Sequence, residues 1–132
     1  MKYILMMNCP RTGYDTMRAW PKADIQAHIA FMHNFNQAIR ESGELVYTEG
    51  VADPREATIV RAGKDGWPVT DGVFAESKEF LVGYWIVEQA CALAARASTA
   101  PGPGGVPANM PIEVRRVMSG PLEEWLEGPQ YP

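Results

Sequence analysis

The stretch PKADIQAHIAFMHNFNQAIRES, residues 21–42, decides the fold of this chain. Its apolar positions recur three and four residues apart, which is the pattern of a helix with one buried face. Pro21 suits a first helical turn, where a backbone N–H is not needed, and Gly43 suits the position just after a helix. We therefore predict one long amphipathic helix. Its buried stripe consists of Ile25, His28, Ile29, Met32, Phe35, Asn36 and Ile39.

Shorter elements surround this helix. Asp65 and Gly66 give a strong hairpin-turn signal, because both central positions of a type I′ turn need a positive φ. Pro68 cannot donate to a strand ladder, so the returning strand is expected at an edge. The segments 8–21 and 99–111 carry Pro and Gly and are predicted as loops, the first of a length often found in lids and binding loops. The predicted strands are 3–7, 45–51, 57–61, 67–70, 80–88 and 112–118, and the predicted second helix is 89–97.

The order of these elements predicts an α+β fold. Two β-α-β units with antiparallel strands between them are typical of a ferredoxin-like sandwich, in which helices cover one face of the sheet. The other face is expected to carry Trp and Tyr residues and needs cover as well. A second copy of the chain, packed sheet against sheet, would supply that cover. We therefore expect a homodimer.

Composition narrows the function classes. The chain has 132 residues, which fits one domain, and 46% of them are hydrophobic, which is too many for a disordered protein. No apolar run approaches the roughly 20 residues of a membrane helix, and the apolar start at residues 1–7 is too short for a signal peptide. The formal charge of −4 disfavours nucleic-acid binding. We expect a cytoplasmic protein with neither a nucleic-acid nor a membrane partner.

The two cysteines, Cys9 and Cys91, stand far apart and in no ligand spacing. Structural zinc sites draw on about four Cys or His ligands, mostly in close pairs. A disulfide is disfavoured in a cytosolic chain. We expect two free thiols in or near the core, no metal and no cofactor.

One segment carries a family resemblance. Residues 69–79, VTDGVFAESKE, followed by GYWIV at 83–87, resemble the motif T-D-G-P-F-A-E-T-K-E and the following strand of YCII-related proteins of the DGPF subgroup. The opening of the chain, residues 28–32, residues 41–46 and residues 112–117 are similar to other parts of that family. Val73 and Arg116 depart from it, because the family has proline at both places.

The resemblance implies a YCII-related domain over residues 1–118 and a ferredoxin-like fold that dimerises into a dimeric α/β barrel. Residues 119–132 have no counterpart in that family, and we expect them to form a tail that packs on the partner subunit. About activity it implies less. Some members are encoded beside, or fused to, extracytoplasmic-function sigma factors, which suggests such a factor as a partner. One branch of the wider family contains a dehydrochlorinase that acts on a chlorinated hydroxyquinol with a His–Asp pair.

Three residues are candidates for chemistry. His28 lies in the apolar stripe and would face the sheet, either as a general base or as a core histidine bonded to a backbone carbonyl. Asp71 would orient and charge His28, or cap its own turn by accepting backbone N–H bonds. Arg115 would bind a substrate carboxylate or phenolate, or pair with Glu49 or Glu113.

Two functions follow from these residues. The first is a cofactor-independent lyase or isomerase, with His28 as general base, Asp71 as its orienting partner and Arg115 as the substrate-binding residue. The second is a non-catalytic module that binds a small ligand or a transcription factor. The sequence shows no nucleophile–base motif and no metal-ligand spacing, which favours the second. A shared fold carries no activity from one protein to another.

Overall fold

The computed structural model describes residues 1–71, 79–121, 123, 126 and 128, and for Asp71 the backbone alone. The C-terminal tail therefore lies largely outside the described residues. Within residues 1–121, single turns of 3-10 helix at Pro54–Glu56, Lys64–Gly66 and Pro103–Gly105 lie in the connections. The main elements are β1 (Tyr3–Cys9), α1 (Gly13–Arg18), α2 (Lys22–Glu41), β2 (Leu45–Gly50), β3 (Ile59–Ala62), β4 (Pro68–Asp71), β5 (Phe80–Val87), α3 (Cys91–Ser98) and β6 (Ile112–Arg116).

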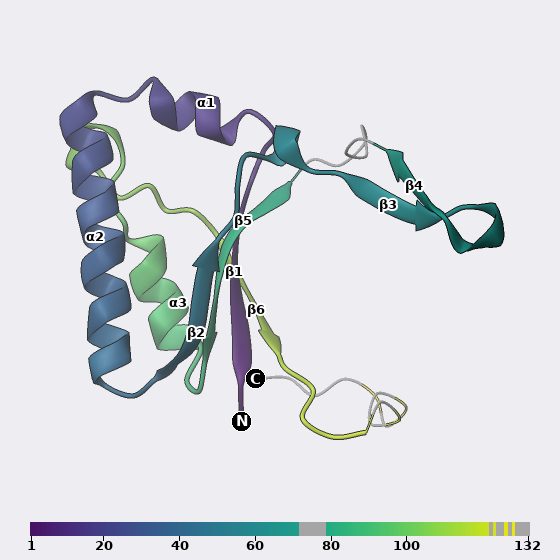
Figure 1. The fold of residues 1–132 in the computed structure, drawn as a ribbon. Helices are drawn as coiled ribbons and strands as arrows, with labels where there is room; N and C mark the ends of the chain where they lie inside the picture. The colour runs from purple at the N-terminus through teal and green to yellow at the C-terminus, as the bar shows by residue number, and fades with distance from the viewer. Residues whose placement is uncertain (72–78, 122, 124–125, 127, 129–132) are drawn as a thin grey trace.

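The predicted α+β class is confirmed. Among the described residues, four strands form one sheet in the order β2-β5-β1-β6, and every neighbouring pair in it is antiparallel. The described strands leave this sheet open rather than closed into a barrel. Helices α2 and α3 lie together on one face of the sheet (Figure 1).

The core lies between this face and the two helices. Leu5 of β1, Ile39 of α2 and Val87 of β5 are its most completely buried large side chains. Alternation along β1 sends Leu5, Met7 and Cys9 toward the helices, while the residues between them face the other way. The same inward side includes Trp85 from β5 and Val114 from β6.

Helix α2 follows its predicted pattern with one correction. Pro21 stands directly before the helix, and Gly43 has the left-handed φ of 80° expected just after it. His28, Phe35 and Ile39 are buried, as the stripe predicted. Ile29, however, is 45% exposed. It sits about 100° around the helix from His28 and falls outside the face that meets the sheet.

The predicted loop over 8–21 is wrong in its middle. Strand β1 continues to Cys9, and residues 13–18 form α1. This helix is too short to be stable alone. A tertiary contact holds it, because the Tyr14 hydroxyl donates to the Val51 carbonyl oxygen at 2.5 Å.

The β3–β4 hairpin stands apart from the main sheet. Its turn has the predicted geometry, with positive φ of 65° at Asp65 and 80° at Gly66. In Figure 1 the hairpin projects on the side of the sheet that α2 and α3 leave open. Trp67 beside the turn is 75% exposed.

The two cysteines differ in burial. Both are free thiols; Cys9 is buried, as expected, whereas Cys91 is exposed. In the part of the chain that the structure describes, no helix is long and apolar enough to cross a bilayer.

Candidate functional site

A cavity of about 440 Å³ opens between α1, α2 and the inner face of the sheet. Its volume lies in the range usual for small-molecule sites, roughly 300–1,000 Å³. The side chains that give it its apolar character are Met7, Met17, Trp20, Met32, Trp85 and Met110. The polar residues of the lining are Thr12, Tyr14, Thr16, His28, Asn36, Thr48, Glu49 and Tyr84. The arrangement suits a small organic ligand, because most of the lining surface is nevertheless apolar.

His28 is the titratable group best placed in this cavity. Its side chain is 7% exposed, and its Nδ1 atom lies 2.9 Å from the carbonyl oxygen of Pro101. A carbonyl oxygen accepts hydrogen bonds and cannot donate, so Nδ1 carries the proton. In the neutral ring Nε2 is then a hydrogen-bond acceptor, and the bond from Nδ1 to Pro101 leaves it available. The ring also meets Trp20 edge-on, with centroids 5.7 Å apart.

The loop after α3 places the Pro101 carbonyl. Ala108 N–H donates to the Ala100 carbonyl oxygen at 2.8 Å, and Gly102 N–H donates to the Val106 carbonyl oxygen at 2.6 Å. The loop also touches α2 directly, because Gly104 N–H donates to Asp24 Oδ2 at 3.2 Å. The irregular Pro/Gly segment is therefore a closed turn fixed against the helix that carries His28.

Asn36 is a second polar group in the cavity. Trp85 Nε1 donates to Asn36 Oδ1 at 2.7 Å, which orients the amide. Asn36 belonged to the predicted stripe, but nothing in the pattern distinguished it from a core residue. The signal that gives it a role is its contact with Trp85, which lies 49 residues away.

A charged cluster fixes α1 over the cavity. Arg55 bonds Asp53 at 2.7 Å and Asp15 of α1 at 2.9 Å. Arg18, also on α1, lies 3.6 Å from Asp53. Hydrogen bonds from the Arg55 side chain and backbone hold the pKa of the Asp53 carboxyl well below its usual range. The cluster therefore ties α1 to the segment that follows β2.

Cys9 also lines the cavity, at the end of β1. Burial raises the pKa of the Cys9 thiol, and the carboxylates of Asp53 and Glu79 raise it further. The nucleophilic form of cysteine is the thiolate. Cys9 is therefore a neutral thiol at physiological pH and a poor nucleophile.

The other two predicted site residues are placed differently. Arg115 is exposed on β6, where Ile112 and Val114 pack on the inner side and the residues between them face outward. Arg115 is not among the described residues that line the cavity, so within a single chain it does not share a site with His28. Asp71 ends β4, its backbone paired with Ile59 of the projecting hairpin. Its side chain lies outside the described residues, so a His28–Asp71 contact stays a prediction.

The described residues contain no group of three or more His, Cys, Asp and Glu side chains that could hold a metal ion. No protein-family model matches the chain, and no curated protein is significantly similar to it.

Proposed function

We propose that this protein binds a small organic molecule in the cavity between α1 and α2, and that His28 acts there as general base of a cofactor-independent lyase or isomerase. The observation that carries the proposal is the bond from Nδ1 to the Pro101 carbonyl oxygen. It orients the ring and leaves Nε2 as the proton acceptor of a side chain that lines the cavity.

The chemistry needs one proton acceptor and an apolar surrounding. Nε2 takes a proton from a C–H or O–H group of the substrate, and the electrons of that bond form a new double bond. In an elimination they expel a leaving group, and in an isomerisation the imidazolium returns the proton to another atom. The Pro101 carbonyl stabilises the imidazolium by accepting the Nδ1–H bond. A positioned base of this kind contributes roughly 10²–10⁴-fold in rate.

The test compares two histidines of the same helix. His28→Gln removes the base, while His33→Gln changes an exposed histidine on the outer side of α2. We would measure exchange of ring-ketone α-hydrogens into D₂O by NMR for a panel of cyclic ketones. We expect exchange to disappear in His28→Gln and to persist in His33→Gln. Equal exchange in both variants, with both folded by circular dichroism, would contradict the role of His28.

A non-catalytic ligand-binding module is the second candidate. It is favoured by the partner of His28, because a backbone carbonyl carries no net charge, whereas the histidine of a catalytic triad is paired with a carboxylate. The module would report ligand binding to a transcription factor, and the family resemblance suggests a sigma factor. Ligand binding by calorimetry, without exchange or turnover in the unmodified protein, would favour this candidate over the enzyme.

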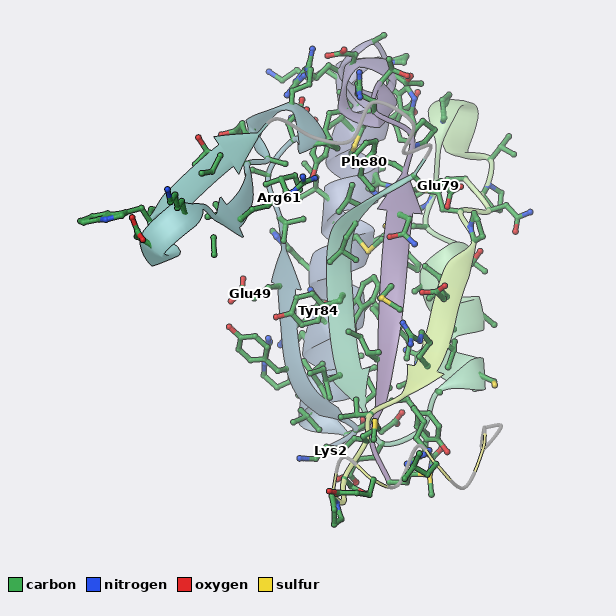
Figure 2. The ribbon with its side chains drawn as sticks, turned by 90° about the vertical axis from the view of Figure 1, so that its right-hand side faces the viewer. Lys2, Glu49, Arg61, Glu79, Phe80 and Tyr84 are labelled. Atoms are coloured by element: carbon green, nitrogen blue, oxygen red, sulfur yellow. The ribbon has the colours of Figure 1, made fainter. Side chains whose placement is uncertain are left out.

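The family and the assembly belong to the same proposal. Along the chain the main elements follow as β1, α2, β2, β5, α3 and β6, and in the sheet the strands stand in the order β2-β5-β1-β6. These two orders together support a ferredoxin-like fold of YCII type. Figure 2 looks onto the sheet face that the described helices leave open, with Tyr84 on it. Ile4, Met6 and Ile86 alternate with the inward residues and add apolar surface to this face. We propose that two copies pack through it and form a dimeric α/β barrel.

Light scattering tests this assembly. We expect a mass of twice the 14.6 kDa of one chain for the unmodified protein. Ile86→Asp should yield a single-chain mass, because it puts a charge into the proposed interface. Ile29→Asp, on α2 on the opposite side of the sheet and 45% exposed, is the control and should stay dimeric. A single-chain mass for the unmodified protein would exclude the dimer and leave the cavity proposal intact.

A further inference from the structure

Helix α2 presents a polar, an apolar and again a polar side chain to the cavity. His28, Met32 and Asn36 follow one another at four-residue spacing, and all three line it. Residues four apart lie on the same side of a helix. With about 1.5 Å of rise per residue, the Cα atoms of His28 and Asn36 are about 12 Å apart. The two polar groups therefore lie about two helical turns apart, at the two ends of the stretch of α2 that lines the cavity.

The donor and acceptor roles at these ends are fixed by the protein. At one end, His28 Nε2 accepts, because Nδ1 donates to Pro101. At the other end, Trp85 Nε1 is a donor only, so the oxygen of the Asn36 amide must face it, at 2.7 Å. The Asn36 Nδ2 group is left as a donor and makes no hydrogen bond within the described part of the chain. One end therefore accepts a hydrogen bond from a ligand, and the other end donates one.

The wall between the two ends is apolar. Met7 and Met32 line it, and thioether sulfurs make favourable contacts with aromatic rings. The described lining contains no lysine or arginine, and Glu49, its acidic residue, is exposed and accepts a hydrogen bond from the Tyr47 hydroxyl at 2.9 Å. Burying an ionised ligand group without a partner costs several kcal/mol or more, so a charged body would be excluded. The wall fits an uncharged ring system.

We infer that the ligand is an elongated, uncharged molecule of about two rings, with a hydroxyl at one end and a carbonyl oxygen at the other. The hydroxyl donates to His28 Nε2, and the carbonyl oxygen accepts from Asn36 Nδ2. Asn36 is thus the residue that determines specificity for the far end of the ligand. This inference rests on the proposed function, because it takes the cavity at His28 as the ligand site.

Three probes and two variants test it by calorimetry. The first probe is a biphenyl with a para-hydroxyl on one ring and a para-acetyl on the other. The second replaces acetyl by isopropenyl, which has the same shape without the acceptor oxygen. The third is the one-ring compound para-hydroxyacetophenone. Asn36→Asp keeps an oxygen for Trp85 and removes the donor, while Asn34→Asp makes the same change at an exposed site of α2.

We expect the acetyl biphenyl to bind the unmodified protein about tenfold more tightly than the isopropenyl biphenyl, as one hydrogen bond of about 1.4 kcal/mol provides. That preference should vanish in Asn36→Asp and persist in Asn34→Asp. Equal affinity for the two biphenyls, or a preference kept in Asn36→Asp, would overturn the role of Asn36.

The outcomes also separate this inference from the proposed function. Tighter binding of the one-ring compound than of either biphenyl, lost in His28→Gln, would overturn the elongated ligand and leave His28 in its role. Two results would count against both the inference and the proposed function. One is that the probes bind His28→Gln as tightly as the unmodified protein, and the other is that none of the probes binds.

Discussion

The imidazole Nδ1 atom of His28 lies 2.9 Å from the main-chain oxygen of Pro101, a residue 73 positions later in the chain. This one contact assigns the proton of the ring to Nδ1. The Pro/Gly segment therefore has a structural role at the site, because its hydrogen bonds hold the Pro101 carbonyl in place. The orientation of the His28 ring thus depends on the loop after α3 as much as on α2.

Replacing Trp85 by phenylalanine should destabilise the fold. The substitution keeps a ring in the core but leaves Asn36 Oδ1 without its donor at 2.7 Å. Losing one partner of a partly buried hydrogen bond costs about 1–3 kcal/mol. Urea unfolding followed by circular dichroism measures this cost. Trp67→Phe, at a position 75% exposed, is the matched control and should leave the unfolding midpoint unchanged. Equal midpoints for the two variants would show that the Asn36–Trp85 bond contributes nothing.

Alanine at Gly13 should destabilise the start of α1. A Cβ there would lie 2.6 Å from Sγ and 2.7 Å from Cβ of Cys9, which no side-chain rotation can relieve completely. Overpacking of this kind costs about 1–3 kcal/mol. Gly50→Ala is the control, because its Cβ would meet the Val82 oxygen at an ordinary 3.7 Å. The free energy of unfolding in urea should fall for the first variant more than for the second. A reversed order would mean that α1 moves freely away from β1.

The Asp53 carboxyl should make stability depend on acid. Its pKa in the folded chain is lowered from 3.8 by hydrogen bonds from Arg55. A lowered folded pKa gives stability that is present above the unfolded value and is lost as pH falls through the folded one. We expect the free energy of unfolding to fall between pH 5 and about pH 2, and to fall less in Asp53→Asn. Asp65→Asn, in the exposed hairpin turn, should keep the full dependence. An unchanged acid dependence in Asp53→Asn would contradict the role of the cluster.

The two thiols should differ in reactivity. Cys91 is exposed, whereas Cys9 is 7% exposed and burial raises the pKa of its thiol. Since the thiolate is the reacting form, a disulfide reagent should label Cys91 much faster than Cys9 at neutral pH. The single-thiol variants Cys9→Ser and Cys91→Ser separate the two rates. A bound probe should slow Cys9 further, because Cys9 lines the cavity. Equal rates would indicate that the cavity opens widely in solution.

The sequence predicted the elements whose signals are local. The stripe of α2 is long enough for its period to stand out, and Asp65-Gly66 specifies its turn by backbone conformation alone. Helix α1 has six residues, too few for a period, and depends on contacts such as Tyr14 with Val51. Its existence could not be read from the segment itself.

The candidate site could be predicted only in part, because local patterns place single residues but do not show their long-range contacts. The inward position of His28 follows from the period of α2, and a backbone carbonyl was one expected partner, but the sequence could not show which carbonyl it is. A backbone carbonyl such as that of Pro101 leaves no mark on residue identity, whereas the proposed partner Asp71 was suggested by a motif. Asn36 and Arg115 show the same limit, because the first gains its role from Trp85 and the second is turned outward on β6. Long-range contacts decide both.

The most direct measurement of the central claim is the tautomer of His28, obtained from long-range ¹H–¹⁵N NMR correlations of the two imidazole rings. The account predicts that Nδ1 of His28 carries the proton and that the Nε2 resonance shifts when the acetyl biphenyl binds, while the exposed His33 shows neither behaviour. A proton found on Nε2 of the neutral ring would contradict it, because the cavity would then have lost the acceptor on which the proposed chemistry depends.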